Sequence, residues 1–182
     1  DEGYWDGGTV FDWWRRGAKG NGVEYITNCV TAMDVVGGRV QSVTLKSGDV
    51  VGCGQVVNAS GPRAALTAEM VGITLPVEPR KRFTWIFSAE TPLDRELPLT
   101  IDPSGVHMRQ DGPTTYLAGG APDAEDDCAV DPSDFTMDHG RWENHVWPII
   151  AARIPQFEAI KVVTEWAGHY AYNTLDQNAI VG

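Results

Sequence analysis

The sequence has few cysteines, and they are not arranged for cross-linking or for metal binding. Its 182 residues include only Cys29, Cys53 and Cys128, which lie far apart and form no Cys-x-x-Cys pair. An odd, scattered set argues against a disulfide framework and against a cysteine-rich zinc site, so we expect reduced and mostly buried thiols. His139 and His145 are six residues apart, a spacing that does not place two ligands on one helix face, and no metal is expected.

Positive charge is also scarce. Lys and Arg number 14 against 25 Asp and Glu, which gives a net charge of −11. Such a balance argues against nucleic acid or an anionic membrane as a partner, because both require clustered positive charge. No apolar run approaches the ~18 residues of a transmembrane helix, and no secretory signal is visible. We therefore expect a cytoplasmic protein, or a mitochondrial one if the source is eukaryotic.

The first half of the chain reads as a helix followed by a small sheet. Thr9 is the expected helix cap, and Gly20-Asn21-Gly22 is typical of a helix end. A Gly-Gly pair between two β-branched runs favours a hairpin turn at Gly37-Gly38. The pattern predicts a three-stranded antiparallel meander, with strands over residues 23–36, 39–45 and 50–57.

The second half is strand-rich, and two helices are expected beside its strands. Pro76 and Pro79 indicate a linker, and Trp85 is expected in the core. Pro148 should kink or split the last helix, whose expected cap is Ser133. The predicted elements are a helix over 63–71, strand-like sequence over 83–118 with a hairpin of 106–109 and 115–118, a helix over 135–153, and a strand over 162–166.

These elements predict an α+β fold rich in antiparallel sheet. A Gly-x-Gly-x-x-Gly after an N-terminal strand would indicate a dinucleotide-binding unit, and the sequence contains none. Seven Trp and an acidic surface could also suit a carbohydrate-binding module with exposed aromatic rings. The acidic stretch 123–127 is expected to be a solvated loop.

Two segments carry a family resemblance. Val56-Val57-Asn58-Ala59-Ser60-Gly61-Pro62 resembles the "VVNAAGPW" segment of the D-amino-acid oxidase, sarcosine oxidase and glycine oxidase superfamily. The segment from Trp166 to Gly182 resembles that superfamily's C-terminal "WAGxY…TxDxxPIIG" segment. Its Tyr-Asn-Thr-x-Asp-Gln-Asn form is similar to the FAD-dependent oxidoreductase domain-containing subgroup, which includes mitochondrial members. The resemblance covers nearly the whole chain.

The resemblance implies a different role for each of three segments of the chain. Residues 1–80 would be a partial FAD-binding lobe, 81–160 an antiparallel substrate-binding lobe, and 161–182 a strand returning to the first lobe. The sequence starts without Met and stops within an apolar run, so both ends look cut. The phosphate-binding unit of such proteins is missing from this stretch, and we expect the stretch alone to bind FAD weakly or not at all.

The resemblance also implies which residues meet the cofactor. Small side chains at the end of a strand leave the backbone open to a large ligand, although strand-to-helix turn chemistry alone would be the simpler explanation without the resemblance. Arg63 departs from the family, which usually has Trp there. The positions that match FAD contacts are Val30 through its backbone, Ala59, Ser60, Gly61, Gly168, Asp176 and Gly182.

The same resemblance suggests residues for the substrate. His169, Tyr170 and His107 are the expected catalytic groups, with a surface position as the alternative for His169. Arg80, Arg82 and Arg109 are the expected carboxylate ligands, because Arg binds a carboxylate at two points. His107 and Arg109 alternate along one strand, so both should project to one sheet face, where the alternative is an exposed basic patch.

The implied activity is oxidation of the C–N bond of a small amine or amino acid, with hydride transfer to N5 of FAD. The resemblance leaves oxygen, a quinone or an electron-transfer flavoprotein open as the electron acceptor. A protein that keeps this fold as a non-enzymatic interaction or assembly factor is the alternative.

Overall fold

The chain forms two compact units in a computed structural model that describes residues 5–122 and 125–182. One unit comprises Asp1–Ala59 with Leu66–Thr74, and the other comprises Ser60–Ala65 with Leu75–Gly182. Helices and two antiparallel sheets together make an α+β fold, as the sequence predicts. The two units are described in turn.

The first unit begins with α1 (Gly7–Gly20), whose cap differs from the predicted one. Asp6 is the N-cap, and its side chain accepts a hydrogen bond from the backbone N–H of Thr9 at 3.2 Å. The cap prediction at Thr9 is therefore wrong by three residues. An aspartate is preferred at this position because its carboxylate satisfies a free N–H at the positive end of the helix dipole.

The sheet of the first unit is the predicted meander, with shorter outer strands. It consists of β1 (Val30–Val36), β2 (Arg39–Leu45) and β3 (Val50–Gly52), in that order. The hairpin turn at Gly37-Gly38 is confirmed, since both residues have positive φ. Residues 23–29 and 53–57, which the sequence places in strands, pair with no neighbour in a regular ladder.

The junction between the units is a short helical segment. η1 (Gly61–Arg63) leads directly into α2 (Ala64–Glu69), close to the predicted helix over 63–71. Gly61 has a φ of +55°, a left-handed conformation that costs a residue with a Cβ about 1 kcal/mol or more. The backbone of this turn therefore requires glycine at position 61 whether or not a ligand binds there.

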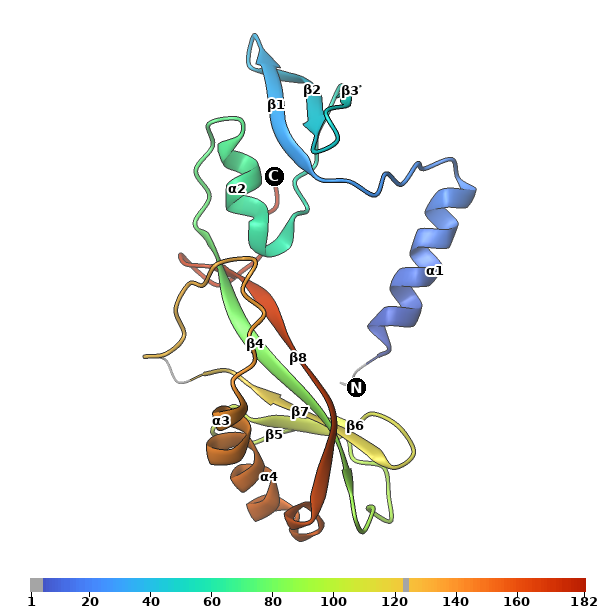
Figure 1. The fold of residues 1–182 in the computed structure, drawn as a ribbon. Coiled ribbons are helices and arrows are strands. Elements are labelled where there is room, and N and C mark those ends of the chain that lie inside the picture. The colour runs from blue at the N-terminus through green and yellow to red at the C-terminus, as the bar shows by residue number, and fades with distance from the viewer. Residues whose placement is uncertain (1–4, 123–124) are drawn as a thin grey trace. The chain divides into compact units, whose positions relative to one another are not determined.

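The second unit is built on a five-stranded antiparallel sheet in the order β5-β6-β7-β4-β8 (Figure 1). Two long strands, β4 and β8, pair along their whole length, and the hairpin of β6 and β7 confirms the predicted one. The strands are β4 (Val77–Ala89), β5 (Thr100–Ile101), β6 (His107–Gln110), β7 (Thr115–Gly120) and β8 (Ile160–Asn173).

Both long strands extend beyond the predictions. β4 runs through Pro79, so the linker predicted there is wrong, and the expected lobe boundary at residue 80 falls inside a strand. Pro79 fits in the ladder because its carbonyl still accepts a hydrogen bond, from Val130 N–H at 2.9 Å. β8 continues to Asn173, so residues 168–170 belong to the strand and do not follow it.

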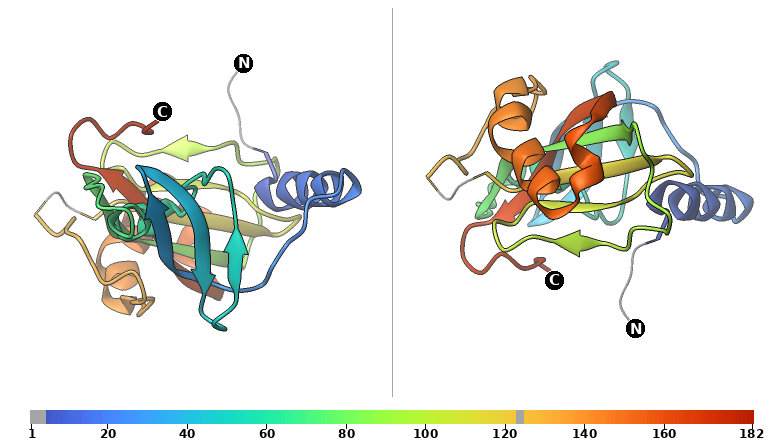
Figure 2. Two further views of the ribbon diagram at one scale, coloured as in Figure 1. Left: turned by 90° about the horizontal axis from the view of Figure 1, so that it is seen from above. Right: turned by 90° about the horizontal axis from the view of Figure 1, so that it is seen from below.

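Helices cover one face of this sheet (Figure 2). α3 (His139–Arg141), the π-helical turn η2 (Trp142–Val146) and α4 (Trp147–Arg153) are continuous, and η3 (Pro155–Glu158) follows. The prediction of a start near residue 135 with Ser133 as cap is wrong. Asp138 caps the helix by accepting from Arg141 N–H at 3.1 Å. Pro148 lies in the first turn of α4, where its missing N–H is tolerated, and the backbone stays helical from η2 into α4, so the predicted split into two helices does not occur.

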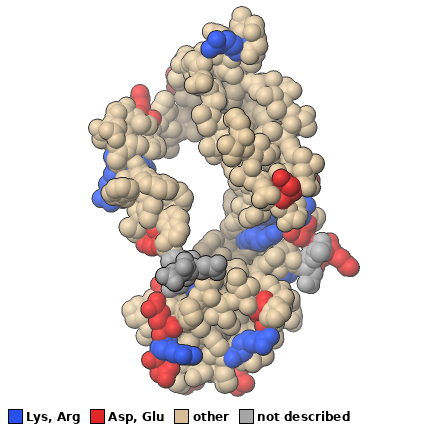
Figure 3. Space-filling view, turned by 180° about the vertical axis from the view of Figure 1, so that it is seen from behind, with Lys and Arg blue, Asp and Glu red and all other residues tan. Residues whose placement is uncertain are grey.

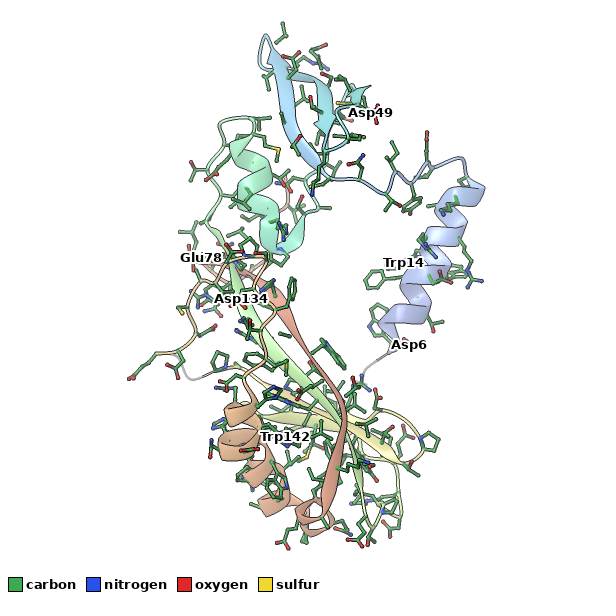
Figure 4. The ribbon with its side chains drawn as sticks, in the orientation of Figure 1. Asp6, Trp14, Asp49, Glu78, Asp134 and Trp142 are labelled. Carbon is green, nitrogen blue, oxygen red and sulfur yellow. The ribbon has the colours of Figure 1, made fainter. Side chains whose placement is uncertain are left out.

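Aromatic side chains fill the space between these helices and the sheet. Trp85, expected in the core, is completely buried, and its ring centroid lies 5.3 Å from that of Trp142 on η2 (Figure 4). Phe157 packs edge-on against Phe87 at 5.0 Å and lies 4.8 Å from Tyr116. Rings in such tilted arrangements add to the stabilisation that their burial provides.

This packing predicts which substitutions unfold the second unit. Phe157→Ala should lower the free energy of unfolding by about 3–5 kcal/mol, because it leaves a cavity among rigid rings. Ile101→Ala, at an exposed strand position of the same sheet, should change it by about 0.5 kcal/mol or less. Denaturant unfolding followed by tryptophan fluorescence would measure both, and equal losses would contradict this account of the core.

Candidate functional site

Strand alternation gives the five-stranded sheet two different faces. One face packs on the helices, and we call the opposite one the open face. Cross-strand register places its side chains, because residues paired across an antiparallel ladder project to the same side. The open face carries Arg80, Arg82, Thr84 and Ile86 of β4, His107 and Arg109 of β6, Leu117 and Gly119 of β7, and Trp166, Gly168, Tyr170 and Tyr172 of β8.

His107 and Arg109 share this face, as predicted, while Met108 between them is buried in the core. The His107 ring lies against Gly119, where a Cβ would come within 3.0 Å of Nε2 and 2.9 Å of the Phe83 carbonyl oxygen. Partial burial and the charge of Arg109 hold the pKa of His107 below its usual value, against a backbone contact to Gly105 that raises it. The imidazole is therefore neutral near pH 7 and can accept a proton.

Arg80 and Arg82 lie on the tyrosine side of the open face. The guanidinium carbon of Arg80 lies 3.5 Å from the centre of the Tyr172 ring, and that of Arg82 lies 5.5 Å from the centre of Tyr170. Tyr170 itself is half exposed, at 49%. Arginine stacked on an aromatic ring keeps its in-plane N–H groups available for a planar anion.

That anion is supplied by the chain itself. Arg82 binds the carboxylate of Asp127 at two points, with N–O distances of 2.8 and 3.0 Å, and Arg80 lies 3.4 Å from the same carboxylate. Partial burial disfavours the charged carboxylate, but the hydrogen bonds and charges of the two arginines still hold the pKa of Asp127 below its usual value. Arg109 lies 3.6 Å from the carboxylate of Asp111, so all three arginines expected to bind substrate have an internal carboxylate partner.

Asp127 belongs to a segment that we call the strap, residues 125–136, which lies along the edge of β4. Ala129 bridges to Arg80 across the backbone, and the Val130 N–H donates to Pro79. Lys81, which projects to the face opposite Arg80 and Arg82, donates to Asp134 at 2.6 Å (Figure 4). The Lys81 hydrogen bond is the main reason that the pKa of Asp134 falls to about 2.

His169 and Tyr170 point to opposite faces of the sheet. His169 pairs with Lys81 in register, and its Nε2 lies 2.8 Å from the Asp134 carbonyl oxygen. Its ring packs against Phe135 in a tilted arrangement, with ring centroids 4.5 Å apart. Tyr170 is on the open face with His107. The structure thus brings Tyr170, His107 and the three arginines onto one face and places His169 on the other, against the strap.

The C-terminal motif forms a turn closed by its own polar side chains. Asn173 is buried and donates to Asp176 at 2.7 Å, and the Asn178 N–H donates to the same carboxylate at 3.0 Å. Gln177 adopts a positive φ inside this turn. These hydrogen bonds give Asp176 a structural role at the position where the resemblance implies a cofactor contact.

The remaining expected cofactor residues occur in both units. Val30 begins β1 and Ala59 also belongs to the first unit, whereas Ser60 and Gly61 belong to the second unit. Gly168 lies in β8 with no positive φ, and no heavy atom comes within 4 Å of the place that a Cβ would take. Gly182, the last residue, is equally open. Unlike Gly61, Gly168 is not required by its backbone conformation.

The structure also bears on metals, membranes and cysteines. Within residues 5–122 and 125–182, no group of three or more His, Cys, Asp or Glu side chains is arranged to hold a metal ion. No helix in those ranges is long and apolar enough to cross a membrane. On the face shown in Figure 3, Lys and Arg lie in scattered small groups.

The thiols are free as expected, but Cys29 and Cys128 are exposed, so their predicted burial is wrong.

Comparison with known proteins identifies the family. The model of the family described as DAO, FAD dependent oxidoreductase, matches residues 1–182. The chain belongs to the DAO family of FAD-dependent oxidoreductases. FAD-dependent oxidoreductase domain-containing protein 1 of Xenopus laevis is 34% identical to it over 212 aligned positions, which cover the whole chain and 42% of that protein. The chain thus spans less than half the length of this DAO-family relative.

Solved structures show the same fold. The crystal structure of L-proline dehydrogenase from P. horikoshii matches 95% of this chain and 45% of its own, with a TM-score of 0.79 and 23% identity. Glycine oxidase from Geobacillus kaustophilus matches 87% of this chain and 40% of its own, with a TM-score of 0.72 and 21% identity. These likenesses establish that the arrangement of helices and sheets is that of part of the DAO fold.

Sequence reasoning missed the strap residues. It predicted a solvated loop over residues 123–127, of which residues 123 and 124 lie outside the described residues. The prediction holds for Glu125 and Asp126, which are exposed. It is wrong for Asp127, whose side chain is only 14% exposed. One available signal was the run Arg80-Lys81-Arg82 in a strand. Three consecutive cations must alternate between two faces, so each face needs acidic partners from elsewhere in the chain.

The depressed pKa of Asp134 predicts how the strap responds to acid. Because its pKa is lowered on folding, this carboxylate stabilises the fold above its ordinary pKa of 3.8, and the contribution disappears as the pH falls toward about 2. Asp134→Asn should therefore lower the denaturant midpoint at pH 7, and the difference from wild type should shrink steadily between pH 4 and pH 2. A difference that stays constant over that range would contradict the role of the Lys81–Asp134 pair.

Proposed function

We propose that the protein carrying this chain is an FAD-dependent oxidoreductase that oxidises the C–N bond of a small amine or amino acid. The observation that carries the proposal is the open face, where a bare glycine backbone lies between aromatic residues on β8 and where His107 projects to the same side from β6. Gly168 leaves room along β8, and Trp166 and Tyr170 are partly exposed on either side of it. A flat aromatic cofactor requires such a surface.

The residues present have the small side chains and accessible backbone that an FAD site needs. Gly168 would admit the ring system to the open face of the second unit, and the family resemblance implies further FAD contacts at Ala59, Ser60, Gly61 and the backbone of Val30. FAD, when bound, supplies the acceptor of the hydride at flavin N5. The names of two structural neighbours, L-proline dehydrogenase and glycine oxidase, support an amine or amino-acid substrate.

The chain's own residues would bind the substrate and manage its proton. An amine gives up hydride from the neighbouring carbon only after its nitrogen loses its positive charge. The His107 imidazole, neutral because its pKa is depressed, can accept that proton. Arg109 shares its face, and its guanidinium suits a substrate carboxylate, while Trp166 and Tyr170 can exclude water.

The proposed activity is tested by flavin reduction in the intact protein. Mixed without oxygen, the flavin-loaded protein should lose its absorption band with at least one substrate from a panel of glycine, L-proline, N-methyl amino acids and D-amino acids. His107→Gln should slow the reduction about 100-fold or more at pH 7, the usual contribution of a general base. If no amine bleaches the flavin, a non-enzymatic role as an interaction or assembly factor replaces this proposal.

Substitutions at two glycines of the open face, Gly168 and Gly119, distinguish an effect on FAD binding from an effect on the stability of the fold. Gly168→Val should leave the free energy of unfolding of the cofactor-free protein within about 0.5 kcal/mol of wild type. It should also weaken FAD binding at least about tenfold, the equivalent of about 1.4 kcal/mol.

Gly119→Ala is the matched control for this experiment. Its new methyl group would meet the Phe83 carbonyl oxygen and the His107 ring, so we expect a loss of about 1–3 kcal/mol of stability. Thermal unfolding and flavin content of the purified variants would measure both effects. Normal flavin content in Gly168→Val would contradict the placement of the ring.

A further inference from the structure

The contact between Asp127 and the two arginines has the form of a bound carboxylate ligand. Arg82 approaches Asp127 through two N–H groups at 2.8 and 3.0 Å, the parallel geometry by which guanidinium recognises carboxylates. Arg80 completes the contact at 3.4 Å. The Tyr172 ring lies 3.5 Å from the guanidinium carbon of Arg80, and the Tyr170 ring lies 5.5 Å from that of Arg82.

The strap does not depend on Asp127 for its attachment. Three other interactions hold it to the sheet and to η1: Val130 N–H with Pro79 O at 2.9 Å, Lys81 with Asp134 at 2.6 Å, and Arg63 with the Pro132 carbonyl oxygen at 2.9 Å. All three lie C-terminal to Asp127 along the strap. The Asp127 side chain can therefore leave the arginines while residues 130–136 stay in place.

The arginines retain capacity for another anion. The Nε of Arg80 is buried and has no hydrogen-bond partner among the residues that the structure describes. Glu78 also binds Arg80, at 3.2 Å, so the cluster holds two guanidinium groups against two carboxylates. Moving Asp127 away leaves an excess positive charge on partly buried groups, which favours a replacement anion strongly.

We propose that Arg80 and Arg82 form a carboxylate-binding site whose resident occupant is Asp127, and that a small carboxylate ligand binds there by displacing it. Asp127 then sets specificity, because only a carboxylate that offers further contacts on the open face competes with an occupant already in the chain. The natural ligand would be the carboxylate-bearing substrate class, and for that identity alone the inference rests on the proposed function.

The test is a titration with acetate, the smallest suitable carboxylate, followed by NMR of its methyl signal. It uses the intact protein, with acetamide as the uncharged probe of the same size. Asp127→Ala should bind acetate at least about tenfold more tightly than wild type, and acetamide equally weakly in both. The double variant Asp127→Ala/Arg82→Met should lose the gain.

Asp134→Ala is the matched control, because it removes a strap carboxylate from the opposite face and leaves the arginine pair occupied. It should bind acetate as wild type does. An equal gain in this variant, a gain that survives Arg82→Met, or no gain in folded Asp127→Ala would overturn the proposal.

Folding is monitored by circular dichroism. Asp127→Asn is the second variant, to be used if Asp127→Ala does not fold. The asparagine keeps the size and one acceptor oxygen but loses the charge, so a smaller gain in acetate binding is expected. If neither variant folds, Asp127 is a structural residue and the proposal is wrong. The titration requires no turnover, so a protein that binds acetate as expected but never bleaches flavin would contradict only the proposed oxidation.

Discussion

The pairing of β4 with β8 is the constraint on which the second unit depends. Each strand is more than a dozen residues long, and the register holds from Val77 opposite Asn173 to Ala89 opposite Ile160, with one irregularity near Ile86. Because alternate residues face opposite sides, this ladder places each paired side chain either on the open face or on the face that meets the core and the strap. Position on the strand therefore determines chemical role.

The basic run of β4 shows how this assignment produces a site. Arg80 and Arg82 project to the open face and meet Asp127, while Lys81 between them projects to the other side and meets Asp134. One short stretch of strand thus attaches the strap from both faces. Each guanidinium group is oriented by a tyrosine of β8, so the neighbouring strand contributes to the same cluster.

Local signals made much of the framework predictable. The Gly37-Gly38 turn and the β6–β7 hairpin follow from short-range backbone chemistry, and the structure confirms both. The family followed from the segments beginning at Val56 and Trp166. The strap was not predictable in the same way, because its ion pairs join residues separated by 45 and 53 positions.

The division of the expected site between two faces has the same origin. The sequence placed Gly168, His169 and Tyr170 after a strand, where consecutive side chains can converge on one ligand. Once β8 is seen to extend to Asn173, strict alternation separates His169 from Tyr170. His169 then contacts the strap, at the Asp134 carbonyl oxygen and at the Phe135 ring. His107 is therefore the histidine that shares the open face with Tyr170.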